Sequence, residues 1–174
     1  MNKVQQKWIE LGISIFIAEM AGVVGSVFIA SSIPTWYAGL AKPEWTPPSW
    51  LFGPVWVLLY ALMGIAAYLV WKVRHQKKEA EGALLLYGVH LFFTSLWSLI
   101  FFGLQNLGLA LAEIFLLWLL IIYTMIFFFK VSRPAGWVFV PYLIWVSFAM
   151  ILNAALFSMQ LCGATSVFRC MAVL

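Results

Sequence analysis

Residues 36–50 read Trp-Tyr-Ala-Gly-Leu-Ala-Lys-Pro-Glu-Trp-Thr-Pro-Pro-Ser-Trp and separate two long apolar runs. Pro43, Pro47 and Pro48 each fix a backbone angle and remove a helical hydrogen bond, so this connection is stiff. Its Trp and Tyr side chains suit the boundary between membrane and water, where an apolar ring is buried and its polar edge stays hydrated. We interpret the segment as a rigid, apolar lid between two membrane-spanning helices.

The composition of the chain identifies its class. Of the 174 residues 65% are hydrophobic and only 9% are charged, and the mean hydropathy is +1.01. A helix needs roughly 20 apolar residues to cross the hydrocarbon core of a membrane, and its backbone groups must be satisfied internally. Five continuous apolar runs meet this need, and none alternates as the strands of a transmembrane barrel would. They cover residues 11–32, 50–71, 83–103, 108–129 and 135–156.

These runs predict an all-α integral membrane protein, a five-transmembrane-helix bundle with a long structured first loop. We expect one membrane domain over residues 1–174, with a lid loop at 33–49 and a tail at 157–174. Lys3 and Lys7 precede the first run, as in a signal peptide. That run is too long for a signal peptide and contains Glu19, so we expect a retained helix.

The basic residues are distributed unevenly between the two sides of the membrane. Five spans place the termini on opposite sides, with eight Lys and Arg on the amino-terminal side and two, Lys42 and Arg169, on the other. The positive-inside rule then predicts a cytoplasmic amino terminus, and we expect the cell membrane of a prokaryote. The net charge of +4 follows from the same bias, so we expect no nucleic-acid partner.

Two carboxyl groups, Glu19 and Glu113, lie within the predicted spans. An acidic residue inside a membrane is a functional candidate, because burying its charge costs roughly 2.5–3.5 kcal/mol even on the lenient insertion scale. The functional interpretation is a proton relay or a ligand anchor. The structural alternative is a protonated or hydrogen-bonded Glu inside the bundle, or one close enough to an interface to stay hydrated. The two depths differ, so we expect no close pair.

Small and aromatic residues recur at helical spacing along the spans. Ala18, Gly22 and Ser26 form a small-residue stripe, which fits packing inside the bundle or a dimer seam equally well. Aromatic stripes on the second, third and fifth spans could line a pocket for a flat ligand or simply pack in the core. His90 belongs to one of these stripes and is either a hydrogen-bonded core residue or a haem ligand.

An ordered set of motifs carries a family resemblance. Residues 36–56 fit the pattern WYxxLxKPxWTPPxWxFxPVW, and WSxxFFG at 97–103, LW at 117–118 and PYxxWxxFAxxLN at 141–153 follow in order. This set, spread over about residues 22–156, resembles the tryptophan-rich sensory protein family, also called the translocator protein or peripheral benzodiazepine receptor family (TspO/MBR). A single WxPP would be weak evidence, whereas the ordered set is specific.

The resemblance implies a homodimeric five-helix bundle that binds porphyrins, sterols or drug-like hydrophobic molecules in a cavity capped by the first loop. It implies no required cofactor, and porphyrin or haem enters as a ligand. Carried over residue by residue, it assigns the following lining or closing positions: Tyr37, Trp45, Pro47, Trp56, Trp97, Trp145, Phe148 and Ala149.

Two positions depart from the family pattern. Many relatives carry Asn where this chain has Thr94, which alters any ligand contact there. No basic residue follows Tyr142 within five positions, so the sterol-recognition pattern of animal members is incomplete.

The tail beyond the resemblance holds both cysteines, Cys162 and Cys170, which are on the predicted extracytoplasmic side, where a disulfide could form. No set of residues has metal-ligand spacing, so we expect no metal site.

Three functional classes remain open. The first is a sensor, receptor or carrier for tetrapyrroles and other planar hydrophobic ligands. The second is an enzyme that degrades porphyrin in light, for which the matching residues are Trp56 and Trp145. The third is a small proton-coupled exporter that uses Glu19. We find no phosphate-binding glycine loop, nucleophile elbow or acid-base pair that would indicate a hydrolase or transferase.

Overall fold

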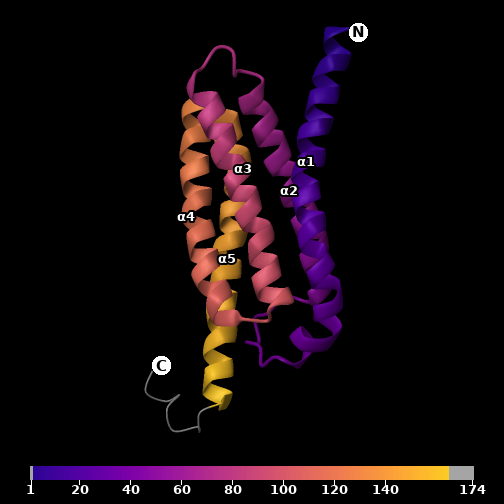
Figure 1. The fold of residues 1–174 in the computed structure, drawn as a ribbon, viewed down its shortest axis with the longest axis vertical. Coiled ribbons are helices and arrows are strands. Elements are labelled where there is room, and N and C mark those ends of the chain that lie inside the picture. Colours follow the sequence, from indigo (N-terminus) through magenta and orange to yellow (C-terminus); the bar gives the residue numbers. More distant parts are fainter. Residues whose placement is uncertain (1, 165–174) are drawn as a thin grey trace.

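The structure of the protein is a computed structural model that describes residues 2–164, with side chains through Cys162. Five helices in this part are long and apolar enough to cross a membrane, which confirms the predicted all-α membrane bundle. They form an elongated bundle with the two ends of the chain at opposite ends (Figure 1). The helices are α1 (Lys3–Ser32), α2 (Ser49–Trp71), α3 (Glu79–Ser98), α4 (Leu107–Val131) and α5 (Arg133–Ala164).

Two short π-helical turns extend these helices at the same end of the bundle. The turn η1 (Ile33–Tyr37) continues α1, and η2 (Leu99–Gly103) continues α3. In η2 the Leu104 amide donates to the Leu99 carbonyl oxygen at 2.8 Å, the i to i+5 bond of a π-helix. The Ser32 hydroxyl donates to the Phe102 carbonyl oxygen at 2.7 Å and so joins the two turns.

The helices extend further than the apolar runs from which they were predicted. The first helix begins at Lys3 rather than Leu11, because Asn2 and Gln5 form a capping box that starts it in the polar segment. At its other end helical structure continues to Gly39, so the predicted loop 33–49 is non-helical only over residues 40–48. The fifth helix runs to Ala164, into the predicted tail 157–174. Hydropathy finds the part of a helix that crosses the hydrocarbon core, whereas hydrogen bonding sets where the helix ends.

Helix packing accounts for two small residues of α1, Gly22 and Gly25. A Cβ added to Gly22 would lie 2.5 Å from the ring of Tyr60 on α2, and one added to Gly25 would lie 2.9 Å from the hydroxyl of Ser98 on α3. The same close approach occurs at Gly64 on α2, where a Cβ would lie 2.5 Å from the Ile15 Cα atom. Gly22 and Gly25 therefore serve packing inside the bundle.

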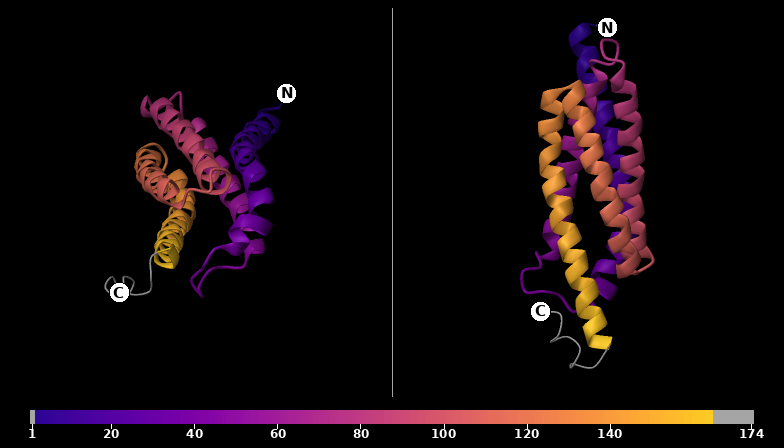
Figure 2. Two further views of the ribbon diagram at one scale, coloured as in Figure 1. Left: turned by 60° about the horizontal axis from the view of Figure 1, so that its bottom comes forward. Right: turned by 90° about the vertical axis from the view of Figure 1, so that its left-hand side faces the viewer.

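The remaining contacts complete the bundle. Helix α1 packs against α2 and α3, α2 packs against α5, and α4 lies between α3 and α5. The α2–α3 and α4–α5 connections lie at the amino-terminal end (Figure 1), where Lys77 donates to the Lys130 carbonyl oxygen at 3.2 Å. The loop 40–48 lies at the opposite end, beside the part of α5 that reaches past its neighbours (Figure 2).

Candidate ligand-binding site

A cavity of about 470 Å³ lies inside the half of the bundle that is nearest the loop. Its walls come from α1, α2, the end of α3, the two π-helical turns and α5. The volume falls within the roughly 300–1,000 Å³ typical of small-molecule sites. Almost all of its lining is apolar or aromatic, as such sites require.

One wall of the cavity is an aromatic cluster on the two π-helical turns and the adjoining end of α3. The Trp97 and Phe101 ring centroids are 4.9 Å apart, and Tyr37 packs 6.0 Å from Phe102. Because a π-helical turn inserts an extra residue, Phe101 and its neighbour Phe102 both line the cavity. The turns therefore concentrate rings at one place.

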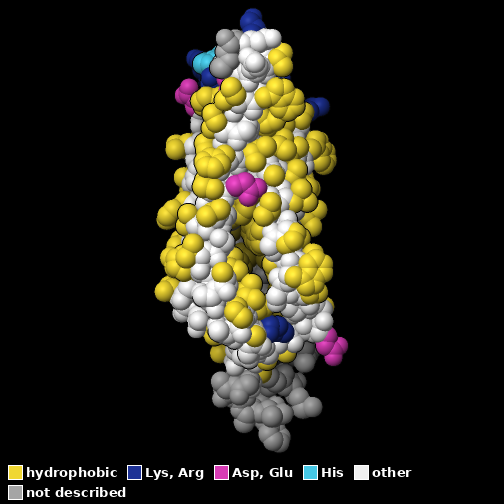
Figure 3. All heavy atoms as spheres, turned by 90° about the vertical axis from the view of Figure 1, so that its right-hand side faces the viewer, with side chains coloured by type: hydrophobic (Ala, Val, Ile, Leu, Met, Phe, Trp, Pro, Cys, Tyr) yellow, Lys and Arg dark blue, Asp and Glu magenta, His cyan; other side chains and the backbone are white. Residues whose placement is uncertain are grey.

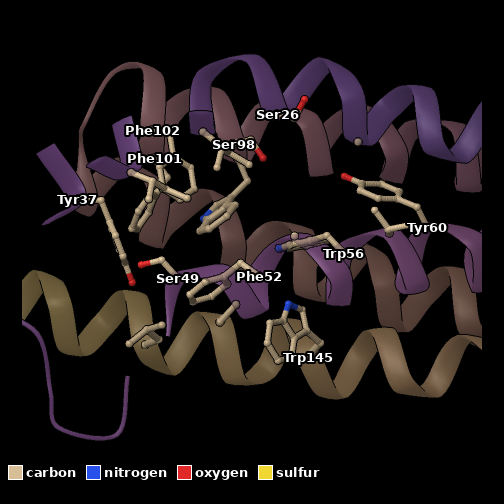
Figure 4. Close-up of a pocket in the computed structure, with 18 of the residues that line it drawn as sticks. Ser26, Tyr37, Ser49, Phe52, Trp56, Tyr60, Ser98, Phe101, Phe102 and Trp145 are labelled. Carbon is tan, nitrogen blue, oxygen red and sulfur yellow. The ribbon is translucent and has the colours of Figure 1, made fainter. Parts of the chain in front are cut away.

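The facing wall comes from α2 and α5. The ring centroids of Phe52 on α2 and Trp145 on α5 are 6.1 Å apart, and those of Trp56 and Tyr142 are 6.3 Å apart. Figure 4 shows Phe52, Trp56 and Trp145 on one side of the cavity, with Phe101 and Phe102 on the other. Two facing aromatic walls can accommodate a flat, hydrophobic molecule between them.

Three buried polar atoms on the lining residues have no hydrogen-bond partner among the described residues. They are the indole nitrogens of Trp97 and Trp145 and the Oδ1 atom of Asn153. Asn153 is held in place because its Nδ2 group donates to the Leu107 carbonyl oxygen at 3.1 Å. An unpaired buried polar group costs about 1–3 kcal/mol, and a ligand that supplies the missing partner recovers that cost.

The loop 40–48 is held at the end of the cavity by specific contacts. Thr46 bonds the Pro43 carbonyl oxygen through both its amide, at 3.0 Å, and its hydroxyl, at 2.7 Å. The Lys42 ammonium donates to the Ala38 carbonyl oxygen and lies 4.9 Å from the centre of the Tyr37 ring. From α5, Gln160 donates to the Ala41 carbonyl oxygen at 3.1 Å. The rigidity expected from the prolines is thus supplemented by bonds to both neighbouring helices.

The structure places five of the eight predicted ligand positions on the cavity wall. These are Tyr37, Trp56, Trp97, Trp145 and Ala149. The other three, Trp45, Pro47 and Phe148, are not lining residues. The ring centroids of Trp45 and Phe148 are 5.9 Å apart, and Trp45 is 49% exposed. These two rings therefore connect the loop to α5 and do not line the cavity.

The two intramembrane carboxyl groups occupy different surroundings. Glu19 lines the cavity. Glu113 is 5% exposed in α4 and does not line it, and neither of its oxygens has a partner within the described part of the chain. Only Glu19 is therefore placed to meet a ligand.

His90 does not line the cavity. Its Nε2 atom is 2.9 Å from the Tyr142 hydroxyl, which is also 3.0 Å from the Thr94 hydroxyl, and all three side chains are buried. The structure therefore favours the core interpretation of His90 over haem ligation. Thr94, the departure from the family pattern, belongs to this network and not to the cavity wall.

The described residues contain no cluster of three or more His, Cys, Asp or Glu side chains that could hold a metal ion. Cys170, the second residue of the possible Cys162–Cys170 disulfide, lies outside the described residues.

Several lining residues were not selected from the sequence. Phe52 and Asn153 were present in the quoted motifs, which was a usable signal, but they were not assigned to the site. Phe102 was also present in a quoted motif, WSxxFFG, but regular helical spacing places it off the face that holds Trp97 and Phe101.

The fold and the site define a class: a multi-pass membrane protein with an aromatic cavity in the half of the bundle that carries a proline-rich loop. The profile of the TspO/MBR family matches residues 14–159. The chain is similar to the tryptophan-rich protein TspO of Chlorobaculum tepidum, with 40% identity over 88% of this chain and 95% of the relative. It is similar to the protein of the same name from Archaeoglobus fulgidus, with 41% identity over 86% of this chain and 95% of the relative. It is also similar to the human translocator protein, with 40% identity over 75% of this chain and 78% of the relative.

The chain therefore belongs to the TspO/MBR family, as its motifs predicted. Membership supports a membrane sensor or receptor role and an environment of lipid around the apolar helices.

Proposed function

We propose that this protein is a membrane receptor or carrier that binds porphyrins and other flat hydrophobic ligands in the cavity. The observation that carries the proposal is the pair of facing aromatic walls, with the unpaired indole N–H groups of Trp97 and Trp145 among their buried atoms. The rings supply stacking area, and the N–H groups can orient an acceptor on the ligand.

A titration with protoporphyrin in darkness tests this function. The chain has ten Trp residues, so binding is followed as quenching of tryptophan fluorescence. Saturable quenching without loss of porphyrin absorbance supports a receptor or carrier. Quenching of the tryptophan fluorescence that rises linearly with porphyrin concentration and never saturates would contradict it.

A second candidate function is light-dependent degradation of porphyrin. It is supported by the position of Trp56 and Trp145, both on the wall where α2 meets α5, with the Trp145 indole nitrogen directed toward Trp56 (Figure 4). Illumination of the bound complex should then bleach the porphyrin, and Trp56→Phe and Trp145→Phe should each slow the bleaching. Bleaching at the wild-type rate in both variants would remove these residues from the reaction.

We further propose a cytoplasmic amino terminus in a prokaryotic cell membrane. Among described residues, Lys42 is the only Lys or Arg that belongs to the opposite end of the bundle. An alkaline phosphatase fused after residue 174 should be active, because this enzyme folds outside the cytoplasm. Phosphatase activity only in a fusion at the amino terminus would show that the amino terminus lies outside the cytoplasm, which contradicts the proposal.

The resemblance also implies a homodimer, which we propose for the protein in membranes. Light scattering of the protein in detergent micelles should give twice the mass of one 19.7 kDa chain. A mass of one chain at all concentrations would contradict it.

A further inference from the structure

The cavity wall carries one formal charge. Among its lining residues only Glu19 has a charged side chain. Glu19 lies near the middle of the span Lys3–Tyr37 and is partly exposed. Charged groups in the middle of a membrane pair with other groups or face a cavity.

The cavity opens to the lipid-facing surface beside this residue. Helices α1 and α2 are in close contact at Ile15 and Gly64, where the Ser14 hydroxyl donates to the Gly64 carbonyl oxygen at 2.7 Å. Nearer the loop they separate, since Val23 on α1 and Val57 on α2 both line the cavity while being 51% and 59% exposed. Figure 3 shows a hollow on this face among hydrophobic side chains, with an acidic side chain above it.

No described group neutralises Glu19. Its carboxyl group takes part in no hydrogen bond or ion pair with residues 2–162, and Tyr60 on α2 lines the same cavity. The hydroxyl of Ser26, one of the polar groups on the same wall, donates instead to the Val23 carbonyl oxygen at 2.7 Å. A ligand that enters between α1 and α2 therefore passes an acidic group that lacks a cationic partner.

A positive charge lies near the other end of the cavity but not on its wall. Lys42 lies 4.9 Å from the centre of the Tyr37 ring, and that ring lines the cavity. The Glu19 side chain is thus on the wall at the lipid-facing mouth, whereas the Lys42 ammonium contacts the ring of a lining residue near the loop.

We propose that Glu19 is a specificity-determining residue at the mouth between α1 and α2, where it favours flat hydrophobic ligands that carry a cationic nitrogen over uncharged ligands of the same shape. The inference rests on the proposed ligand-binding function of the cavity. It adds a charge preference that the aromatic walls alone do not provide, because rings of this kind accept neutral and cationic flat molecules alike.

Two probes of nearly equal shape test this preference. N-methylacridinium is a permanent cation, and acridine is uncharged at pH 8. Each is titrated against the full chain in phosphatidylcholine nanodiscs, with empty nanodiscs as the blank. Glu19→Gln should weaken acridinium binding roughly tenfold, since it removes an ion pair in a partly desolvated site. It should change acridine affinity by less than about twofold, because the stacking area is unaltered.

Two further variants separate charge from structure. Glu10→Gln removes the same charge from the same helix, but its carboxyl group contacts only Gln6, at 3.2 Å, and lies outside the cavity. It should leave both affinities unchanged. Glu19→Asp keeps the charge and should keep the preference for acridinium. Acridine binding itself reports that each variant is folded.

The outcomes distinguish this inference from the proposed function. If both probes bind the wild type and Glu19→Gln leaves the ratio of their affinities unchanged, the inference is wrong and the binding function stands. If neither probe binds the wild type saturably, the proposed function fails and this inference fails with it.

Discussion

The Gln160 side-chain amide donates a hydrogen bond to the Ala41 carbonyl oxygen at 3.1 Å, and this bond joins the end of α5 to the loop at the cavity's end of the bundle. The two residues are 119 positions apart. Gln160 also lies beyond residue 156, where the apolar run ends, so the extension of α5 has a structural role at the site.

Replacement of Gln160 should therefore loosen the loop. We expect Gln160→Ala to raise the dissociation rate of protoporphyrin about two- to tenfold, the equivalent of one ordinary hydrogen bond. Stopped-flow displacement of the bound porphyrin measures this rate. Ser158→Ala is the matched control, because the Ser158 hydroxyl donates only to Ala155 within α5. Equal rates in the wild type and Gln160→Ala would show that this bond does not retain the ligand.

The unpaired indole nitrogen of Trp145 should recognise an acceptor atom on the ligand. Trp145→Phe keeps an aromatic ring beside Phe52 but removes the N–H group. In darkness we expect it to weaken acridine, which has a ring nitrogen, by about 1 kcal/mol more than anthracene, which has none. Fluorescence titration of both compounds gives the difference. Trp137→Phe, an exposed position on the same helix, is the control. An equal loss for both compounds would assign Trp145 a packing role alone.

The tight α1–α2 contact should not tolerate a larger residue at Gly64. A Cβ at this position would meet backbone atoms of Ile15 and Ser14, which cannot rotate away. We expect Gly64→Ala to lower the free energy of unfolding by about 1–3 kcal/mol, the usual cost of overpacking. Thermal unfolding in detergent measures this loss. Gly88→Ala on α3, where an added Cβ has nothing within 4 Å, should not destabilise the protein. Equal midpoints for the two variants would contradict the packing argument.

The phenol of Tyr142 should stabilise the bundle without contacting the ligand. Tyr142→Phe leaves His90 Nε2 with only a 3.4 Å contact to the Thr94 hydroxyl. We expect a loss of about 1–3 kcal/mol in the free energy of unfolding, because a buried polar atom loses its partner. Tyr123→Phe, at an exposed position, is the control. The absorption spectrum of added haem should be the same in Tyr142→Phe and the wild type, and a changed Soret band would indicate that His90 does reach the ligand.

The sequence predicted the bundle well because its five apolar runs are long and uninterrupted. The proline and aromatic spacing of residues 36–50 also identified the structured first loop and, through the family motifs, much of the cavity wall. It could not predict that Phe102 joins Phe101 on that wall, since this depends on the π-helical turn η2. Nor could it place Trp45 against Phe148 instead of in the cavity, because that contact depends on how the loop meets α5.

If flat ligands bind between the two aromatic walls, a substitution that fills this space should prevent their binding. Ala149 lines the cavity, whereas Ile151, two positions along the same helix, is exposed on the outside of the bundle. Protoporphyrin is titrated in darkness against the wild type, Ala149→Phe and Ile151→Phe. We expect saturable binding to the wild type and to Ile151→Phe, with affinity reduced roughly tenfold or more in Ala149→Phe, because the new ring occupies the space of the ligand. Wild-type affinity in Ala149→Phe would contradict binding between the two walls.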